Sequence, residues 1–321
     1  MSHSSIQQDI FKTLEHRMGK DILRRRLNIQ AKNAASFYQG KGLSQFHPEN
    51  VEWIPKLLKI ILTGCGMLNR GYRNSMDYRV EYVETRFDVL PKAFDGLRIL
   101  QIADPHFDGI PDGGKKLSSI LSSLEFDLCV LTGDYRFLTF HEYTQPIKIL
   151  SNIIRLLECE HGIFGILGNH DFVEMAPMME QLGIRMLLNE NFSLVKSGKT
   201  IHIAGVDDPH YHGCHDLRKA LTGLPREDFT LLLSHSPEII KQAEAAGADY
   251  YLCGHTHAGQ ICLPGGVPII TNAHCSRKYT KGSWSFGSMH GHTSRGTGSS
   301  GISVRFFCPP EITIHSLRSN N

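Results

Sequence analysis

Five short polar clusters rich in Asp, Asn and His lie between positions 104 and 257 of this 321-residue chain. They are Asp104-Pro105-His106, Gly133-Asp134, Gly168-Asn169-His170-Asp171, Ser234-His235-Ser236 and Gly254-His255-Thr256-His257. Carboxylate, imidazole and amide oxygen form a borderline-hard ligand set that suits Mn²⁺, Fe²⁺ or Zn²⁺. None of the 8 cysteines is placed to complete a structural zinc site. The clusters therefore predict a site for divalent metal ions.

A run of apolar residues, expected to be a β-strand, comes directly before each cluster. The runs are LRILQIA, LCVLT, GIFGIL, FTLLL and YYLC. Residues 97–103 and 128–132 are continuously apolar, which is typical of strands covered on both faces. Open α/β sheets bind ligands beyond the carboxyl ends of their strands, so five such ends would bring the clusters together. Glycines at 133, 168 and 254 would let the chain turn sharply beside the ions.

Residues 81–321 form the expected body of the molecule. Their first part alternates strands with helices near 114–124, 143–158 and 174–182, which predicts a largely parallel βαβαβ unit. The later part is richer in strands, so two sheets packed face to face and flanked by helices would account for both parts. The Gly/Ser-rich stretch 282–301 lies between strands and is expected to be an active-site loop.

Residues 1–80 form a basic, mainly helical segment ahead of that body, with a loop containing Gly, His and Pro near 40–50. The segment holds 13 Lys/Arg against 6 Asp/Glu, so its net charge is +7, while the rest of the chain is at −5. This asymmetry suggests an anionic partner, either a membrane surface or nucleic acid, and the alternative is a solvated basic helix. The acidic body disfavours nucleic acid.

The most apolar stretch of the chain runs from Leu57 to Leu68 and contains Lys59. It is far shorter than the roughly 20 residues that a membrane span needs. Two alternatives stay open: an amphipathic segment in a membrane interface, or a helix packed on the body. The residues that flank it are Trp53, Lys56, Arg70 and Tyr72.

The cysteines and the N-terminal residues indicate in which cellular compartment the protein is expected. No CxxC pair occurs, and Cys129 and Cys253 lie inside apolar runs, which is typical of reduced thiols in a cytoplasmic protein. The N-terminus lacks the apolar region of a cleaved signal peptide, and Arg24 to Arg26 precede polar residues, unlike a twin-arginine signal. We expect a cytoplasmic protein, with peripheral association at the inner face of the cytoplasmic membrane as a further option.

The order of the clusters, DxH, GD, GNHD, a lone His and GHxH, resembles the calcineurin-like metallophosphoesterase superfamily. The resemblance spans residues 97 to about 316, and the ending SRGTGSSGISVRFFCPPEITIHSL is similar to a branch of small bacterial phosphoesterases. It implies a four-layer α-β-β-α sandwich, here with a helical N-terminal appendage. It also implies a hydrolase of phosphate esters or anhydrides.

The resemblance assigns metal ligands to this sequence residue by residue. Asp104, His106, Asp134 and His257 would hold a first ion, and Asp134, Asn169, His235 and His255 a second. Asp134 would bridge the two ions, which we expect to be Mn²⁺, with Fe²⁺ or Zn²⁺ as alternatives. A water activated between them would attack phosphorus in line, without a covalent enzyme intermediate.

The resemblance also gives roles to His170 and Asp171. His170 would contact the phosphate or act as general acid to the leaving group, unless it only supports Asn169. Asp171 would orient His170 through a hydrogen bond, unless it is a helix N-cap.

Other polar groups have less specific patterns. Asp207 to His212 is expected to be a solvated turn, and a third metal site at His290 and His292 is disfavoured. Arg295 and Arg305 would either contact substrate phosphates or form structural ion pairs.

Two-metal chemistry does not fix the substrate, because one fold of this kind serves several phosphohydrolases. A basic segment beside an apolar stretch suits an amphipathic substrate at a membrane. Within the resembled branch this favours the UDP-2,3-diacylglucosamine pyrophosphohydrolase of lipid A biosynthesis. The alternatives are a general phosphodiesterase or phosphomonoesterase on soluble substrates, a nuclease, and a non-catalytic scaffold. A scaffold would be expected to have lost ligands, and none is missing here.

Overall fold

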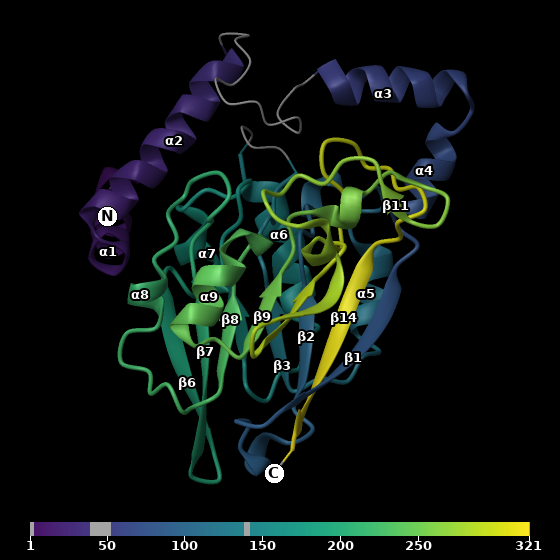
Figure 1. Ribbon diagram of the computed structural model, residues 1–321. Helices are drawn as coiled ribbons and strands as arrows, with labels where there is room; N and C mark the ends of the chain where they lie inside the picture. Colours follow the sequence, from purple (N-terminus) through teal and green to yellow (C-terminus); the bar gives the residue numbers. More distant parts are fainter. Residues whose placement is uncertain (1–2, 39–52, 138–141, 321) are drawn as a thin grey trace.

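Two six-stranded sheets packed face to face form the centre of the protein, as the computed structural model in Figure 1 shows. The structure describes residues 3–38, 53–137 and 142–320. The first sheet has the order β1-β14-β2-β3-β4-β5, in which β2 to β5 are parallel and β14 runs antiparallel to β2. Its strands are β1 (Arg79–Phe87), β2 (Arg98–Ile102), β3 (Leu128–Leu131), β4 (Ile163–Gly165), β5 (Ile184–Met186) and β14 (Glu311–Ser319).

The second sheet has the order β12-β13-β9-β8-β7-β6, in which β7, β8, β9 and β13 are parallel. Its strands are β6 (Glu190–Lys196), β7 (Lys199–Gly205), β8 (Thr230–Leu233), β9 (Tyr250–Cys253), β12 (Gly282–Phe286) and β13 (Met289–Thr293). A small separate hairpin joins β10 (Cys262–Leu263) to β11 (Val267–Pro268).

Apolar side chains alternate between two cores along the central strands. Ile99 and Val130 point into the core between the sheets, while Leu100 and Cys129 point into the core under the outer helices. All four are fully buried, so the continuous apolar runs belong to strands covered on both faces, as the sequence predicts. All eight cysteines are free thiols.

Helices cover the outer face of each sheet, so the order of layers is α-β-β-α, and the predicted fold class is confirmed. The core of the first sheet is closed by α5 (Lys115–Leu121), α6 (Thr144–Ile154) and α7 (Met175–Gln181). The core of the second sheet is closed by α8 (Leu217–Ala220) and α9 (Ile240–Ala246).

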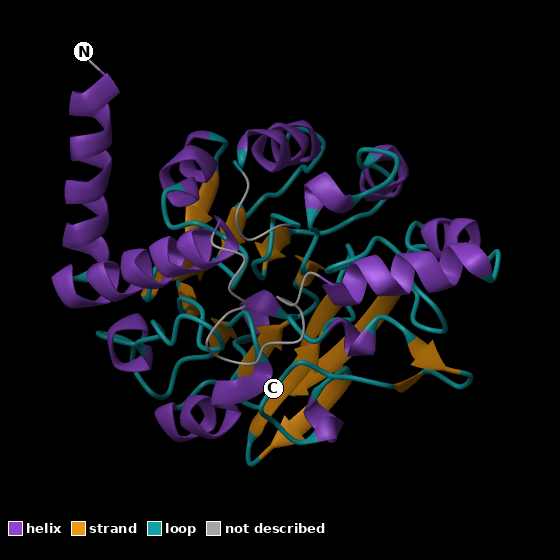
Figure 2. Cartoon of the chain, turned by 90° about the horizontal axis from the view of Figure 1, so that it is seen from above, coloured by secondary structure: helices purple, strands orange, loops and turns teal. Residues whose placement is uncertain are grey.

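Four helices come before the first strand, in two pairs. Figures 1 and 2 show α1 (His3–Met18) and α2 (Lys20–Tyr38) at one side of the molecule, and α3 (Trp53–Gly64) and α4 (Leu68–Asn74) at the other. Leu14 and Met18 are buried in the same core as the outer helices of the first sheet. The proposed boundary between residues 80 and 81 falls inside β1. The loop expected near 40–50 lies outside the described residues.

Within the described part of the chain, no helix combines the length and the apolar character needed to cross a membrane.

The stretch 282–301 is only partly the loop that the sequence suggests. Residues 282–293 form the β12–β13 hairpin at the edge of the second sheet. Trp284 is buried while its neighbours Ser283 and Ser285 face outward, and this period-2 alternation is typical of a half-buried strand. Residues 294–301 do form a loop at the end of the sheets where the polar clusters lie.

Candidate metal centre

The five polar clusters lie in the loops that follow β2, β3, β4, β8 and β9, where strands of both sheets end. These loops gather at the upper end of the sandwich in Figure 1. Each of the seven predicted ligands is at most 6% exposed, so polar groups that normally stay hydrated are held together out of water. They are Asp104, His106, Asp134, Asn169, His235, His255 and His257.

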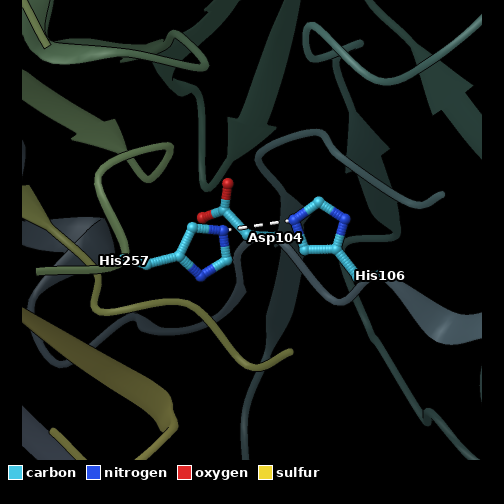
Figure 3. Close-up of side chains that lie close together, drawn as sticks. All are labelled: Asp104, His106 and His257. Carbon is cyan, nitrogen blue, oxygen red and sulfur yellow. Dashed lines mark hydrogen bonds between the residues drawn. The ribbon is translucent and has the colours of Figure 1, made fainter. Parts of the chain in front are cut away.

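The first group of predicted ligands is shown in Figure 3, where the rings of His106 and His257 face each other and the carboxylate of Asp104 lies beside them. One ligand atom from each of the three lies within 4.8 Å of the others. The two Nε2 atoms of His106 and His257 face each other at 3.2 Å. Oδ2 of Asp134 lies 3.7 Å from Nε2 of His106. The four side chains predicted to hold the first ion are therefore brought together.

The second group consists of Asp134, His235 and His255, whose ligand atoms also lie within 4.8 Å of one another. Nε2 of His235 is 3.4 Å from Oδ2 of Asp134 and 2.8 Å from Oδ1 of Asn169. Nδ1 of His255 is 3.2 Å from the same nitrogen of His235. Asp134 takes part in both groups, which is the position that a bridging ligand needs.

Backbone carbonyls fix which ring nitrogen three of the histidines present to the centre. Nδ1 of His106 lies 2.5 Å from the carbonyl of Arg136, and Nδ1 of His235 lies 2.9 Å from that of Thr132. His255 is turned the other way, with Nε2 at 2.6 Å from the carbonyl of Asn272. A ring that donates to a carbonyl keeps its other nitrogen free of a proton, as a metal ligand must.

Burial affects the protonation of these groups. It lowers the pKa values of His106 and His255, which favours neutral imidazoles. Burial, opposed by nearby His235, raises the pKa of the Asp104 carboxyl to about 7, whereas His235, His170 and His106 outweigh burial and hold the pKa of Asp134 well below its usual range. Burial opposes a charged ring at His235, but Asp134 outweighs it and raises the pKa of His235 well above its usual range. Two buried carboxyl groups beside buried imidazoles form a donor set that fits divalent cations, because cations offset the cost of desolvating the carboxylates.

The backbone around the ligands adopts an uncommon conformation. Five of the seven predicted ligands have positive φ angles, between 41° and 70°. Left-handed geometry costs a non-glycine residue about 1 kcal/mol or more and concentrates at functional sites. The loops are thus held in a geometry that serves the convergence of their side chains. The residues are Asp104, His106, Asp134, His255 and His257.

Two glycines leave room for the carboxylates. A Cβ on Gly254 would lie 2.0 Å from Oδ2 of Asp104, and one on Gly168 would lie 2.2 Å from Oδ1 of Asp134. The sequence suggests that these glycines serve sharp turns. In the structure they serve the close approach of a ligand side chain.

His170 lies beside the two groups of ligands. Its Nδ1 is 2.9 Å from the carbonyl of Phe137, and its Nε2 is 3.9 Å from Oδ2 of Asp134. Burial lowers the pKa of His170 to about 4. The ring is therefore fixed in orientation, with Nε2 directed at the centre.

Asp171 does not act on the ring of His170, so the predicted orienting bond is wrong. Its carboxylate accepts bonds of 2.8 Å from the backbone amides of Asp134, Tyr135 and Gly168. These amides belong to two different metal loops, and the ring of His170 uses a carbonyl instead. Asp171 is therefore a brace between the loops after β3 and β4.

The segment from Asp207 to His212 is not the solvated turn that the sequence suggests. Asp207, Asp208 and His212 are at most 1% exposed, and Asp208 accepts from Nδ1 of His212 at 2.8 Å. The ring of His210 packs on that of His255 with centroids 4.1 Å apart. The segment directly follows β7. The rule that polar residues after the carboxyl ends of strands lie together, which predicts the other clusters, could therefore have predicted this one as well.

Arg26 on α2 is a further residue of the centre that sequence reasoning missed. Its guanidinium is fully buried and donates to the carbonyls of Gly168 at 3.1 Å and Asp171 at 2.9 Å. It also pairs with Asp207 at 3.1 Å. One side chain of the N-terminal segment thus holds the loop that carries Asn169. No local pattern around Arg26 signals a contact about 140 positions away in the chain.

The two candidate arginines of the C-terminal part have structural roles. Arg305 is fully buried, donates to the carbonyl of Arg295 at 2.8 Å, and lies 3.2 Å from Nδ1 of His257. Arg295 forms ion pairs with Glu81 and, at 2.7 Å, with Glu311. Neither guanidinium needs a substrate phosphate as partner.

His290 and His292 also have ordinary partners. Nδ1 of His290 lies 2.9 Å from Oγ of Ser285, and Nε2 of His292 lies 2.8 Å from Oε1 of Glu311. His290 is thus bonded within the β12–β13 hairpin, and His292 is bonded to the first residue of β14. Neither ring is arranged with the other as a metal-binding pair.

A cavity of about 360 Å³ lies against the metal centre. One wall contains Asp134, Asn169, His170, His255 and His257. The rest of the lining is mainly apolar, with Thr256, Gln260, Asn272 and Ser300 as its polar members, and α3 contributes to it. The apolar lining residues of the cavity are Pro55, Leu58, Ile261, Ile269, Ile270 and Ile302.

Known proteins are similar to this chain over the region that contains the predicted metal ligands. Residues 97–259 match the calcineurin-like phosphoesterase family, and this span contains all seven predicted ligands. YkuE, an uncharacterized metallophosphoesterase of Bacillus subtilis, is 31% identical over 288 residues, which are 84% of this chain and 98% of that protein. The phosphodiesterase YaeI of Escherichia coli is 28% identical over 231 residues, 68% of this chain and 82% of YaeI. A transmembrane protein with metallophosphoesterase domain from Danio rerio is 28% identical over 320 residues, 93% and 67% of the two chains.

Proposed function

This chain belongs to the calcineurin-like phosphoesterase family and is a metal-dependent phosphoester hydrolase, and we propose that it cleaves a phosphoanhydride or phosphodiester bond between a nucleotide and a lipid. The specific candidate is the pyrophosphate bond of UDP-2,3-diacylglucosamine. The observation that supports the proposal is the mainly apolar cavity, which is lined by four of the seven predicted ligands, Asp134, Asn169, His255 and His257. Apolar lining residues would contribute little to the binding of a purely soluble, charged substrate.

The ligand side chains have defined parts in this proposal. Asp104, His106, Asp134 and His257 would hold one ion, and Asp134, Asn169, His235 and His255 the other. When bound, two divalent ions supply a nucleophilic water at neutral pH and stabilise negative charge on the phosphoryl oxygens. Mn²⁺ is our first candidate, ahead of Fe²⁺ and Zn²⁺, because the set mixes carboxylates, an amide oxygen and imidazoles.

His170 is the proposed phosphate contact. Its Nδ1 already donates to the carbonyl of Phe137, so only Nε2 is left to reach a substrate in the cavity. The negative charge of a bound phosphate favours the protonated ring, which donates from both nitrogens. A ring in that state would stabilise charge on a phosphoryl or leaving-group oxygen.

Relatives bear on the kind of bond. YaeI is named a phosphodiesterase, which supports diester or anhydride cleavage over phosphomonoester cleavage. Hydrolysis of soluble phosphodiesters or phosphomonoesters remains the alternative, and a non-catalytic scaffold is disfavoured because every ligand is present. Cytoplasmic location with peripheral contact at the inner membrane face stays part of the proposal.

The test is hydrolysis by the purified protein supplied with Mn²⁺, using UDP-2,3-diacylglucosamine beside bis-p-nitrophenyl phosphate. We expect release of UMP from the lipid nucleotide, strongly preferred over the generic ester and abolished by Asn169→Ala. Hydrolysis of the generic ester alone would leave the metal chemistry and remove this substrate. No metal-dependent hydrolysis of either compound would contradict the proposed function.

A further inference from the structure

Exposed apolar side chains are concentrated in two elements that line the cavity and in a residue next to one of them. Twelve large hydrophobic residues are exposed in the described part of the chain, and eight of them belong to α3, to the segment 263–270 or to its neighbour Phe307. The surfaces of monomeric proteins normally scatter such residues, and a concentration marks an interaction site. The eight are Leu57, Ile60, Ile61, Leu263, Val267, Ile269, Ile270 and Phe307.

Helix α3 is apolar on two faces. Leu58 and Leu62 pack on the buried cluster of Ile302, Val304 and Phe306. Leu57, Ile60 and Ile61 form a stripe at spacings of three and four residues, and they are 46%, 69% and 50% exposed. A helix on the surface of a globular protein would carry polar residues on that second face.

Helix α4, which follows α3 in the chain, packs closely on residues 302–306. A Cβ on Gly71 of α4 would come within 2.7 Å of Val304. Nδ2 of Asn74 donates to the carbonyl of Arg305 at 2.9 Å, and the amide of Arg305 donates to Gly71 at 3.2 Å. Nη2 of Arg305 in turn lies 3.2 Å from Nδ1 of His257, so α4 is connected through one residue to the metal centre.

The two described segments that contribute to this surface, 53–76 and 250–310, carry formal charge of one sign. Residues 53–76 contain Lys56, Lys59, Arg70 and Arg73, all exposed, and no Asp or Glu. Residues 250–310 also contain no Asp or Glu, and Nζ of Lys281 binds the carbonyl of Gly266 in the turn between β10 and β11. Apolar side chains among basic ones match an anionic lipid bilayer, in which acyl chains lie under negative headgroups.

We infer that α3 and the segment 261–270 form a docking surface for an anionic phospholipid bilayer. Figures 1 and 2 both show α3 beside the β10–β11 hairpin at one corner of the molecule. Both elements line the cavity that leads to the ligands, so the acyl part of a membrane substrate would pass from the bilayer into the cavity without crossing water. The role in substrate entry rests on the proposed function, whereas the docking does not.

Vesicle flotation tests the docking with the full-length protein. We expect the wild type to float with vesicles containing phosphatidylglycerol and to bind pure phosphatidylcholine vesicles at least about tenfold less, with binding weakened by salt. The double variant Ile60→Ser/Ile61→Ser should lower the bound fraction at least about tenfold by removing buried apolar area. Leu156→Ser/Val195→Ser, which changes two exposed apolar residues outside this surface, should bind like the wild type.

Hydrolysis of bis-p-nitrophenyl phosphate, measured on the same samples, separates the two proposals. All variants should keep the wild-type rate on this soluble ester, because none of the changed residues lies among the ligands. Vesicle binding without any hydrolysis would refute the proposed function and leave the docking intact. Flotation that is absent, or unaffected by Ile60→Ser/Ile61→Ser, would overturn the docking. The docking would also be overturned if the wild type were a dimer that Ile60→Ser/Ile61→Ser dissociates and if neither protein bound vesicles.

Discussion

The seven proposed ligands illustrate what single residues reveal in a sequence. Each follows an apolar run, so the strand-end rule was enough to predict that Asp104, Asp134 and His255 would meet. The rule did not indicate which ring nitrogen each histidine presents, because the carbonyls that decide this belong to other loops. The family resemblance pairs Asp171 with the ring of His170, whereas in the structure its carboxylate accepts from three backbone amides.

Gly254→Ala tests the close packing around a ligand. The new Cβ would lie 2.0 Å from Oδ2 of Asp104, so the carboxylate must move out of the first group of ligands. We expect Mn²⁺ affinity to fall at least about tenfold, the lower end of the effect of disturbing a ligand's support. Isothermal titration calorimetry measures it.

Gly64→Ala is the matched control, because a Cβ there meets nothing within 4 Å. Equal Mn²⁺ affinity in both variants would show that Gly254 does not set the position of Asp104.

At the scale of elements, α2 is where sequence reasoning failed most clearly. Its run of three arginines suggests a solvated basic face, yet Arg26 is fully buried against the loop that carries Asn169. Propensity and charge describe the helix by itself, whereas the partners of Arg26 come from residues 168, 171 and 207. The same limit applies to the segment after β7, where packing between loops buries two aspartates that look solvated.

Arg26→Met tests this contact. It removes the guanidinium but leaves Asp207 buried and unpaired, which costs about 3–5 kcal/mol when one partner of a buried pair is lost. We expect urea unfolding to show a loss of that size, together with weaker Mn²⁺ binding. Arg24→Met, on the exposed face of α2, should change neither quantity.

A second change on the same background separates charge from packing. Asp207→Asn removes the unpaired charge, so Arg26→Met/Asp207→Asn should recover part of the lost stability. No recovery in urea unfolding would contradict the view that Asp207 depends on Arg26.

At the scale of the whole molecule, the centre exists only where the two sheets meet. The first sheet supplies Asp104, His106, Asp134 and Asn169, and the second supplies His235, His255 and His257. The fold class could be predicted from the order of apolar runs, but the composition of the first sheet could not, because β14 inserts between β1 and β2 from more than 200 positions further along the chain. The division into 1–80 and 81–321 stays a prediction. Leu14 and Arg26 of the first part pack against residues of the second part.

Ions that link the two sheets should stabilise the entire fold. Binding to the folded state alone raises stability by about 2.7 kcal/mol when the free ion is at 100 times its dissociation constant. We expect the Tm of the wild type to rise on adding Mn²⁺ and to fall with a chelator, as differential scanning calorimetry would show. Asn169→Ala should reduce this rise, and an equal rise in both proteins would place the bound ion elsewhere.

We propose that seven side chains hold two ions and that hydrolysis needs both. The most direct measurement is the hydrolysis rate of bis-p-nitrophenyl phosphate while metal-free protein is titrated with Mn²⁺, with bound metal per chain measured at each point. We predict saturation at two ions per chain, with activity rising mainly with the second. Full activity with one ion, or activity that survives complete removal of metal, would contradict the account.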